Sequence, residues 1–398
     1  MMIHKTYFKE LKMKRIFCIV LIAAFAATFG FSQELRLSGY MNSGLGLWMS
    51  NEEDNDDPQL MVYGVDSERF MGRFRLNGSY INEAQTGGAD FRLQLQGTGA
   101  VTDSGSGAIL SFAYGWVRLL DMFTIKAGLV DDGVWVSGDV IFDDDNTEGT
   151  GLLLRATPVS GLDLGVGAYL ASYAGSGSNN ILPVLPTQFA LDEAKYTFNL
   201  AYTAPGLFRL MGSFRPANEA PGNSATQTAQ ALASLRLLAV NNLTAVIVAQ
   251  LNRVDEFGDT GETSIYQTLA YGLGDLSIGL NAAQYIRNTP TGSDAANDLA
   301  LRFNPWISYA LNDGGLVPRL DLTYFMGGQQ SGVDYHRRAF TANYDSDRYV
   351  VNARPSIKFN LDPRTSLEIG DSFYYSVAGS NADAVFNNVI YVDLTIRF

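Results

Sequence analysis

The side chains that could carry out chemistry in this chain are few, and most of them are acids. One stretch, residues 139 to 148 (DVIFDDDNTE), holds three consecutive carboxylates at Asp143, Asp144 and Asp145. Carboxylate oxygens are ligands that Ca²⁺ prefers, but this stretch lacks the twelve-residue spacing and the glycine of an EF-hand. We therefore expect no cofactor, with calcium at this acidic stretch as the alternative.

Catalysis by a serine and a histidine would depend on His336, in the segment DYHRRAF, because the other histidine, His4, lies in the N-terminal stretch discussed next. No GxSxG elbow accompanies it, and the sequence has no HExxH motif and no phosphate-binding glycine loop. The one cysteine, Cys18, also lies in the N-terminal stretch, which leaves no thiol for metal or redox chemistry after it. We expect the protein not to be an enzyme.

The first 33 residues are typical of a secretory signal. Lys12, Lys14 and Arg15 precede an apolar run from 16 to 31, which is short for a membrane-spanning helix, and small residues follow it. We predict a signal peptide over 1–33, removed on export, and one barrel domain over 34–398. An uncleaved N-terminal anchor is the alternative.

Charge and hydropathy exclude several classes of protein. The net charge is −13, and removal of residues 1–33, with five bases and one acid, makes it about −17. An acidic chain is a poor partner for nucleic acid. Beyond the signal no apolar stretch reaches the length of a helical span, but the strands of a membrane barrel hide their hydrophobicity in alternation.

Alternation with a period of two runs through almost the whole chain. In residues 69 to 80 one parity is apolar (Phe70, Phe74, Leu76, Tyr80) and the other is polar (Arg69, Arg73, Arg75, Asn77). Residues 90 to 98, 299 to 309 and 349 to 359 repeat the arrangement, whereas 231 to 254 is apolar on both parities. Such a pattern predicts strands with one apolar face.

Strand length separates a membrane barrel from a secreted sandwich, which also alternates. Strands of soluble sandwiches average about 5 to 6 residues, whereas many runs here reach about 10 to 14, enough to cross a bilayer at a tilt. Apolar side chains could not fill the interior of so wide a barrel, so the apolar face must look outward to lipid. The fold class is therefore all-β, a transmembrane antiparallel β-barrel.

Short links and longer polar stretches follow one another along the chain. The short links fall at Asp121, 158–161, 204–206, 241–242, 272–275, 312–315 and 362–363. Outer-membrane barrels have short periplasmic turns on one rim and longer external loops on the other. Counting runs gives about 18 strands, with 16 as the alternative. Trp48, Trp116, Tyr114, Tyr169, Tyr202, Tyr324 and Tyr391 suit interfacial girdles.

The C-terminal segment 385–398 (VFNNVIYVDLTIRF) resembles the terminal strand by which outer-membrane barrels are recognised for assembly, with Phe398 as the assembly signal. Residues 113–129 and 151–169 are similar to the hairpins before and after the constriction loop of Gram-negative porins. Asp121-Met122 departs from the glycine expected in the first hairpin. The chain thus looks like a general porin of the outer membrane.

The resemblance implies a constriction loop that folds into the lumen opposite a basic wall. The loop would carry Asp131, Asp132, Asp139, Asp143, Asp144, Asp145 and Glu148. The inward parity of the strands supplies the pore wall: Arg69, Arg73, Arg75, Arg92, Lys126, Arg155, Arg209, Arg302, Arg354 and Lys358. Acids facing arginines across a narrow pore would set a transverse field. A solvated acidic loop, and arginines paired structurally with Asp90, Asp163, Asp321 or Asp393, are the alternatives.

These observations predict a multi-pass β-barrel of the bacterial outer membrane that acts as a porin, a passive diffusion channel for small hydrophilic solutes and ions. The alternative is a non-conducting barrel that serves as a surface adhesin or binding protein. The expected partners are outer-membrane lipid, small hydrophilic solutes and ions, and the barrel-assembly machinery, with no nucleic acid. The porin resemblance implies a homotrimer, for which the doubly apolar segment 231–254, with Leu237 and Ile247, is a candidate contact.

Overall fold

A computed structural model describes residues 34–50, 58–63, 73–96, 107–131, 135, 148–170, 194–217, 229–252, 254, 261–287, 298–326, 348–378 and 384–398. The predicted signal peptide lies outside these residues. In the described part, no helix combines the length and hydropathy needed to span a membrane. Nearly all described residues lie in β-strands or in the turns that join them.

One antiparallel sheet contains all the strands. They are β1 (Glu34–Ser50), β2 (Gln59–Tyr63), β3 (Arg73–Ile81), β4 (Gly87–Gln96), β5 (Gly107–Leu119), β6 (Phe123–Asp131), β7 (Glu148–Val159), β8 (Leu162–Leu170), β9 (Ala194–Ala204), β10 (Phe208–Arg215), β11 (Gln230–Leu237), β12 (Leu243–Asn252), β13 (Glu262–Leu273), β14 (Leu276–Arg287), β15 (Asp298–Tyr309), β16 (Leu316–Met326), β17 (Arg348–Asn360), β18 (Thr365–Ala378) and β19 (Val385–Arg397).

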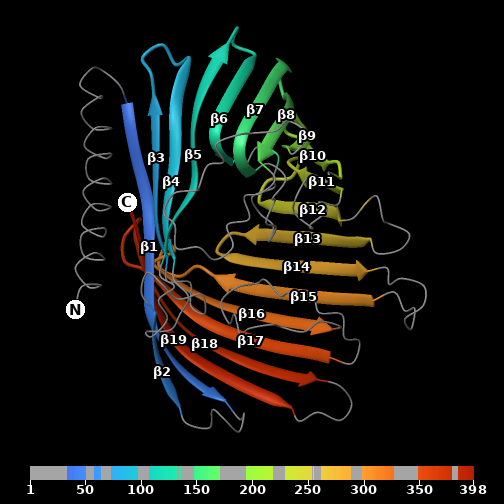
Figure 1. The fold of residues 1–398 in the computed structure, drawn as a ribbon. Coiled ribbons are helices and arrows are strands. Elements are labelled where there is room, and N and C mark those ends of the chain that lie inside the picture. Colours follow the sequence, from blue (N-terminus) through green and yellow to red (C-terminus); the bar gives the residue numbers. More distant parts are fainter. Residues whose placement is uncertain are drawn as a thin grey trace, which may run out of the picture.

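The sheet closes on itself. From β3 to β19 each strand pairs with the next along the chain. β19 then pairs with β1, and the two strands lie side by side in Figure 1. β3 pairs with the first part of β1 and β2 with its last part, so β2 and β3 share one place in the ring. The result is a closed barrel of 18 strand positions, which confirms the predicted fold class and the larger strand count.

The short turns lie where the sequence predicted them. β5 and β6 are separated by residues 120–122, and β17 and β18 by 361–364. Leu120 and Asp121 both have positive φ values, of 52° and 56°, so this turn forms without the expected glycine. A further short turn at 82–86 was not predicted; there Asn82 Oδ1 accepts hydrogen bonds from the backbone N–H groups of Thr86 and Gly87.

The two faces of the barrel differ sharply in chemistry. Outward positions hold large exposed apolar side chains, for example Leu200, Ile307, Ile357 and Ile390. The opposite parity is rich in polar residues that are buried or half-buried, because side chains converge on the concave side of a closed sheet. An apolar outside and a polar inside are the arrangement of a membrane barrel.

The predicted aromatic girdle is largely wrong. Only Tyr202 and Tyr324 lie on the outward face, with 40% and 42% of their surface exposed. The remaining five aromatic residues have the inward parity, with Trp48 bonded through Nε1 to Asn387 Oδ1 (3.2 Å) and Tyr391 through its hydroxyl to Glu368 Oε1 (3.0 Å). Glycines of the inner face leave room for two of these rings: an added Cβ would lie 2.7 Å from Trp116 at Gly88 and 2.3 Å from Tyr391 at Gly370.

Candidate functional site

The inner wall of the barrel carries most of the basic residues that the sequence assigned to the pore. The described ones lie on inward positions of β3, β4, β6, β7, β10, β15 and β17: Arg75, Arg92, Lys126, Arg155, Arg209, Arg302, Arg354 and Lys358. Arg73 begins β3, but its side chain is outside the described part, and Arg69 is outside it altogether. The alternation of each strand positions these side chains, because the neighbouring residues on both sides face lipid.

The bases of β3 and β4 are held by polar and aromatic neighbours. Arg75 donates two hydrogen bonds to Gln94 Oε1, at 3.0 Å and 2.6 Å. Arg92 donates to Asn77 Oδ1 (3.0 Å), and its guanidinium lies 4.7 Å from the centre of the Phe112 ring. These contacts fix the direction in which the two guanidinium groups point.

Of the predicted loop acids, Asp131 is the one whose side-chain contact the structure describes. Asp131, at the end of β6, forms an ion pair with Arg92 of the wall, with 3.6 Å between Nη1 and Oδ2. Glu148 begins β7 and is the register partner of Asp131, but its side chain is not described. Asp132, Asp139, Asp143, Asp144 and Asp145 lie outside the described residues.

Trp135, from the predicted constriction loop, lies against the inner wall. It is fully buried and packs on Ala201 and Met211, which are register partners on β9 and β10. Its ring also covers Gly165 of β8, where an added Cβ would come within 2.7 Å of the indole. All three wall positions have inward parity, so this residue of the stretch 131–148 lies inside the barrel.

A charge pair borders the place where Trp135 lies. Arg155 of β7 donates two hydrogen bonds to Asp163 Oδ1 of β8, at 2.9 Å and 2.6 Å. The Arg155 guanidinium carbon is 6.0 Å from the centre of the Trp135 ring. The sequence left open whether Arg155 pairs with Asp163, and the structure shows this pair. Both side chains lie on the inner wall, with 27% and 20% of their surface exposed.

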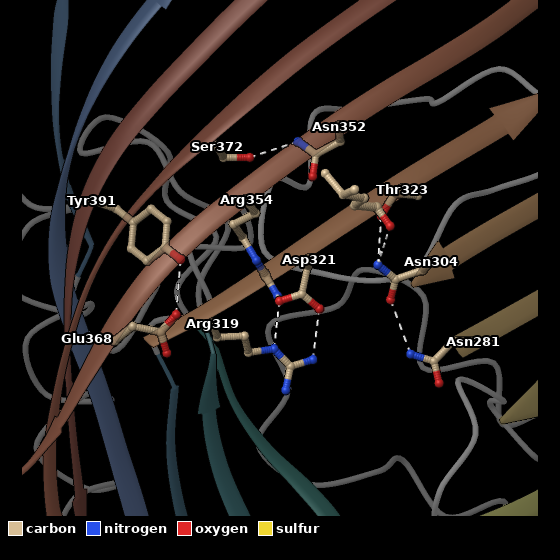
Figure 2. A network of polar contacts seen from close by, with 11 residues as sticks. Asn281, Asn304, Arg319, Asp321, Thr323, Asn352, Arg354, Glu368, Ser372 and Tyr391 are labelled. Carbon is tan, nitrogen blue, oxygen red and sulfur yellow. Dashed lines mark hydrogen bonds and ion pairs between the residues drawn. The ribbon is translucent and has the colours of Figure 1, made fainter. Parts of the chain in front are cut away.

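On the opposite half of the wall, polar side chains from neighbouring strands reach one another across the sheet (Figure 2). Asn281 donates to Asn304 Oδ1 at 3.1 Å, and Asn304 donates to Thr323 Oγ1 at 3.0 Å. These residues come from β14, β15 and β16. The row satisfies the buried amide of Asn304 and keeps uncharged polar groups on the inner side of this part of the wall.

Next to this row, Asp321 of β16 gathers two arginines. Arg319 binds it in a bidentate manner, at 2.6 Å and 2.8 Å, and Arg354 of β17 approaches at 3.4 Å (Figure 2). Arg319 also lies 4.4 Å from the ring centre of Trp306. Farther along the wall, Glu368 is the register partner of both Lys358 and Asp393, so acids and bases lie side by side here.

Some basic residues of the wall were missed from the sequence. Arg236 lies directly opposite Arg209 across β10 and β11, Arg319 is described above, and Lys195 of β9 stands 5.6 Å from the Tyr169 ring. Strand parity could have found Arg319, which alternates with Pro318 and Leu320. The apolar character of both faces of β11 hid Arg236.

Phe398, the predicted assembly signal, takes part in closing the barrel. Its backbone N–H donates to Gly39 O (3.1 Å) and its carbonyl accepts from Gly39 N–H (2.9 Å), on β1. Its ring stacks on Phe74 of β3 at 5.9 Å between centroids. The end of the chain is thus tied to the first strands, whereas recognition by an assembly machinery stays a prediction.

Comparison with known proteins finds similar folds but no relative with a similar sequence. No model of a protein family matches the sequence, and no curated protein matches it either. Among solved structures, OpdK of Pseudomonas aeruginosa is similar with a TM-score of 0.54 at 12% identity, over 92% of this chain and 99% of that one. OccK11 (OpdR) of the same organism gives 0.53 at 13%, over 92% and 96%.

A third neighbour, OprD of P. aeruginosa, gives a TM-score of 0.52 at 12% identity, over 92% of this chain and 96% of that one. Because the identities are so low, these similarities show the fold alone: this chain folds as a closed β-barrel like those of these outer-membrane proteins. They leave the solute to be argued from this chain's own residues.

Proposed function

We propose that this protein is a porin of the bacterial outer membrane, a passive diffusion channel for small hydrophilic solutes and ions. The observation that carries the proposal is the chemistry of the two faces. Large apolar side chains cover the outside, and inward positions of the same sheet hold partly exposed charged side chains such as Arg155, Asp163 and Arg319. A lumen of this character favours water and hydrophilic solutes over apolar ones.

A constriction supports selectivity. Trp135 packs on the inner face of β8, β9 and β10, and this contact ties part of the stretch 131–148 to the wall. We propose that this stretch narrows the lumen and that its acids, Asp132, Asp139, Asp143, Asp144, Asp145 and Glu148, face the basic wall across it. Such a field would order water and dipolar solutes in the narrow region.

The same reasoning assigns partners. Outer-membrane lipid would surround the apolar outside, and the C-terminal strand with Phe398 would be presented to the barrel-assembly machinery. A homotrimer follows from the porin resemblance. None of the proposed steps requires a bound cofactor, and catalysis has no place in the mechanism. Water-filled passage along a charged wall is enough for the transport of small polar molecules.

Solute entry into proteoliposomes tests the proposal. Vesicles that contain the protein are moved into isotonic solutions of neutral sugars of increasing size, and swelling is followed by light scattering. A porin admits the small sugars quickly and excludes the large ones at a definite size. Folded protein in the vesicles without any swelling would favour the alternative, a non-conducting surface-binding barrel.

A further inference from the structure

Three aromatic side chains follow one another on the inner face of β5. Phe112, Tyr114 and Trp116 occupy successive inward positions and are all half-buried. The register confirms their face, because Phe112 is the partner of Arg92 and Trp116 the partner of Lys126, two bases of the inner wall. Inward positions repeat about every 7 Å along a strand, so the rings form a row along the pore, called here the aromatic row. Among the described strands, no other has aromatic residues at even two successive inward positions.

A β-bulge marks one end of the aromatic row. Arg92 of β4 pairs with Phe112, but the next residue, Leu93, pairs with Leu110, so Ser111 is an extra residue of β5. Because of this extra residue, Phe112 faces the lumen while Leu110, two residues earlier, shares the outward face with Leu93. Bulges are frequent next to functional sites, where they change the direction of a side chain.

The neighbouring strands, β4 and β6, hold these rings against the wall (Figure 1). The indole of Trp116 lies over Gly88 of β4, where an added Cβ would come within 2.7 Å of it. The rings of Phe112 and Tyr114 are 5.7 Å apart between centroids and tilted by 37°. Rings that are fixed in this way and only half-buried keep part of their apolar surface towards the lumen.

Hydrogen-bond donors and an acceptor stand beside the aromatic row. The Arg92 guanidinium lies 4.7 Å from the centre of the Phe112 ring, and Lys126 Nζ lies 4.8 Å from the centre of the Tyr114 ring. Asp90 of β4 is the register partner of Tyr114 and has the same inward parity as Arg92. The apolar rings are thus bordered on the inner wall by cationic donors and by a carboxylate acceptor.

This combination selects one kind of ligand. A small anion would use the cations and leave the rings without a role, and a wholly apolar molecule would leave the charged groups without partners. A pyranose ring uses both, because its C–H groups form an apolar face that stacks on an aromatic ring, and its hydroxyl groups donate and accept hydrogen bonds at the edge. A row of rings, rather than one ring, fits a chain of such sugars.

We propose that the aromatic row of β5, with Asp90, Arg92 and Lys126 beside it, binds short neutral oligosaccharides of pyranose sugars as they pass through the lumen. The inference rests on the proposed channel function and names one class of its solutes. Passage requires sites that bind a solute well enough to admit it and weakly enough to release it. Successive rings along the strand provide such sites, because a sugar can leave one ring as it reaches the next.

Block of the ion current by maltohexaose, a linear glucose oligomer, tests the proposal. Added to open channels in a planar bilayer, it should interrupt the current reversibly and saturably, and glucose, which covers only one ring, should bind more weakly. Trp116→Ala should weaken the affinity for maltohexaose about tenfold, the loss expected for one stacking contact, whereas Trp116→Phe keeps a ring and should retain most of it.

Trp306→Ala is the matched control. Trp306 is also a half-buried inward indole over a glycine, Gly279, and it lies 4.4 Å from Arg319. Its neighbours on the inner face of β15 are Asn304 and Ser308, so it belongs to no aromatic row. This variant should leave the affinity unchanged.

Calorimetry on detergent-solubilised protein measures the same affinity without conduction, so this inference and the channel function can fail separately. A protein that conducts but gives neither block nor heat with maltohexaose would overturn the inference and leave the channel in place. A protein that never conducts but binds maltohexaose, and loses binding with Trp116→Ala, would support the site and contradict the channel.

Two further results would overturn the inference. One is an equal loss of affinity in Trp116→Ala and Trp306→Ala. The other is block by benzoate that depends on Trp116, without any binding of maltohexaose, because the row would then bind aromatic anions. Folding of each variant is checked by the mobility shift of unheated and heated samples on gels. If Trp116→Ala does not fold, Phe112→Ala takes its place with the same expectation.

Discussion

The indole of Trp135 lies over the backbone of Gly165, so closely that a Cβ at position 165 would come 2.7 Å from the ring. A glycine on β8 thus makes a recess in the inner wall, and Ala201 and Met211 complete it. The contact joins Trp135, which follows β6 in the chain, to the inner face of β8, β9 and β10. We regard it as the anchor of the proposed constriction.

Replacing Trp135 by Ala should release this anchor. Loss of a fully buried Trp typically costs about 3–5 kcal/mol, more than enough to free a loop from its wall. We expect a higher single-channel conductance, or a noisier one, with an unchanged barrel. Gly165→Val should act in the same direction by displacing the ring, and the double variant should add little to either change. Unaltered conductance in both single variants would exclude this role of Trp135.

The selectivity of the pore should respond to Asp321. Asp321→Asn removes the negative charge that faces Arg319 and Arg354, and this should raise the permeability of anions relative to cations, read from the reversal potential in a salt gradient. Asp321→Ala, which leaves two bases without their acid, should also destabilise the barrel by about 3–5 kcal/mol. Asp121→Asn, in an exposed turn, serves as the control for stability. If Asp321→Asn leaves the reversal potential unchanged, Asp321 and its two arginines lie away from the path of the ions.

Closure of the barrel should depend on Gly39. A Cβ there would lie 2.1 Å from the carbonyl oxygen of Arg75 and 2.7 Å from the Phe398 ring, so Gly39→Val should cost about 1–3 kcal/mol or prevent closure. The temperature at which the barrel loses its compact gel mobility measures the effect. Gly212→Val is the matched control, because the nearest neighbour of a Cβ at position 212 would be 3.6 Å away. Equal temperatures for the two variants would contradict this role of Gly39.

The turn between β17 and β18 should weaken in acid. The backbone N–H groups of Arg364 and Thr365 bond Asp362 Oδ1, at 2.7 Å and 2.9 Å, and they lower the pKa of Asp362 below its ordinary value. A lowered folded pKa gives stability that is present above the unfolded pKa of about 3.9 and is lost as the pH falls through the folded pKa. Asp362→Ala should lower the unfolding temperature at pH 7 and lower it less as the pH falls towards 2. Asp362→Asn should remove that pH dependence, and an equal loss from Asp362→Ala at both pH values would exclude the carboxylate as its cause.

Strand periodicity was enough to predict the barrel, because each crossing strand must present an apolar outside and a polar inside. The short turns at 204–206 and 312–315 followed from glycine, asparagine and aspartate, which adopt the left-handed backbone of tight turns; Asn312 and Asp313 have φ values of 52° and 54°. The count of 18 ring positions also follows from runs of alternation, although β2 and β3 share one position because each pairs with a different part of β1.

The details of the wall were harder to predict. An aromatic residue can face lipid or lie over a glycine of the inner face, and the sequence of a single strand does not distinguish the two. Tyr391 illustrates this: a Cβ at Gly370, on the neighbouring strand, would lie 2.3 Å from its ring, and this space decides its position. Trp135 was overlooked because it lies outside every alternating run, and Asp371 interrupts an outward face that the alternation predicts to be apolar.

Single-channel recording of the refolded mature protein in a planar bilayer tests the central claim most directly. We expect stepwise openings of uniform size whose reversal potential in a salt gradient shifts when Asp143, Asp144 and Asp145 are changed to Asn. A folded barrel, shown by its heat-dependent gel mobility, that never produces a conductance step would contradict the assignment as a porin.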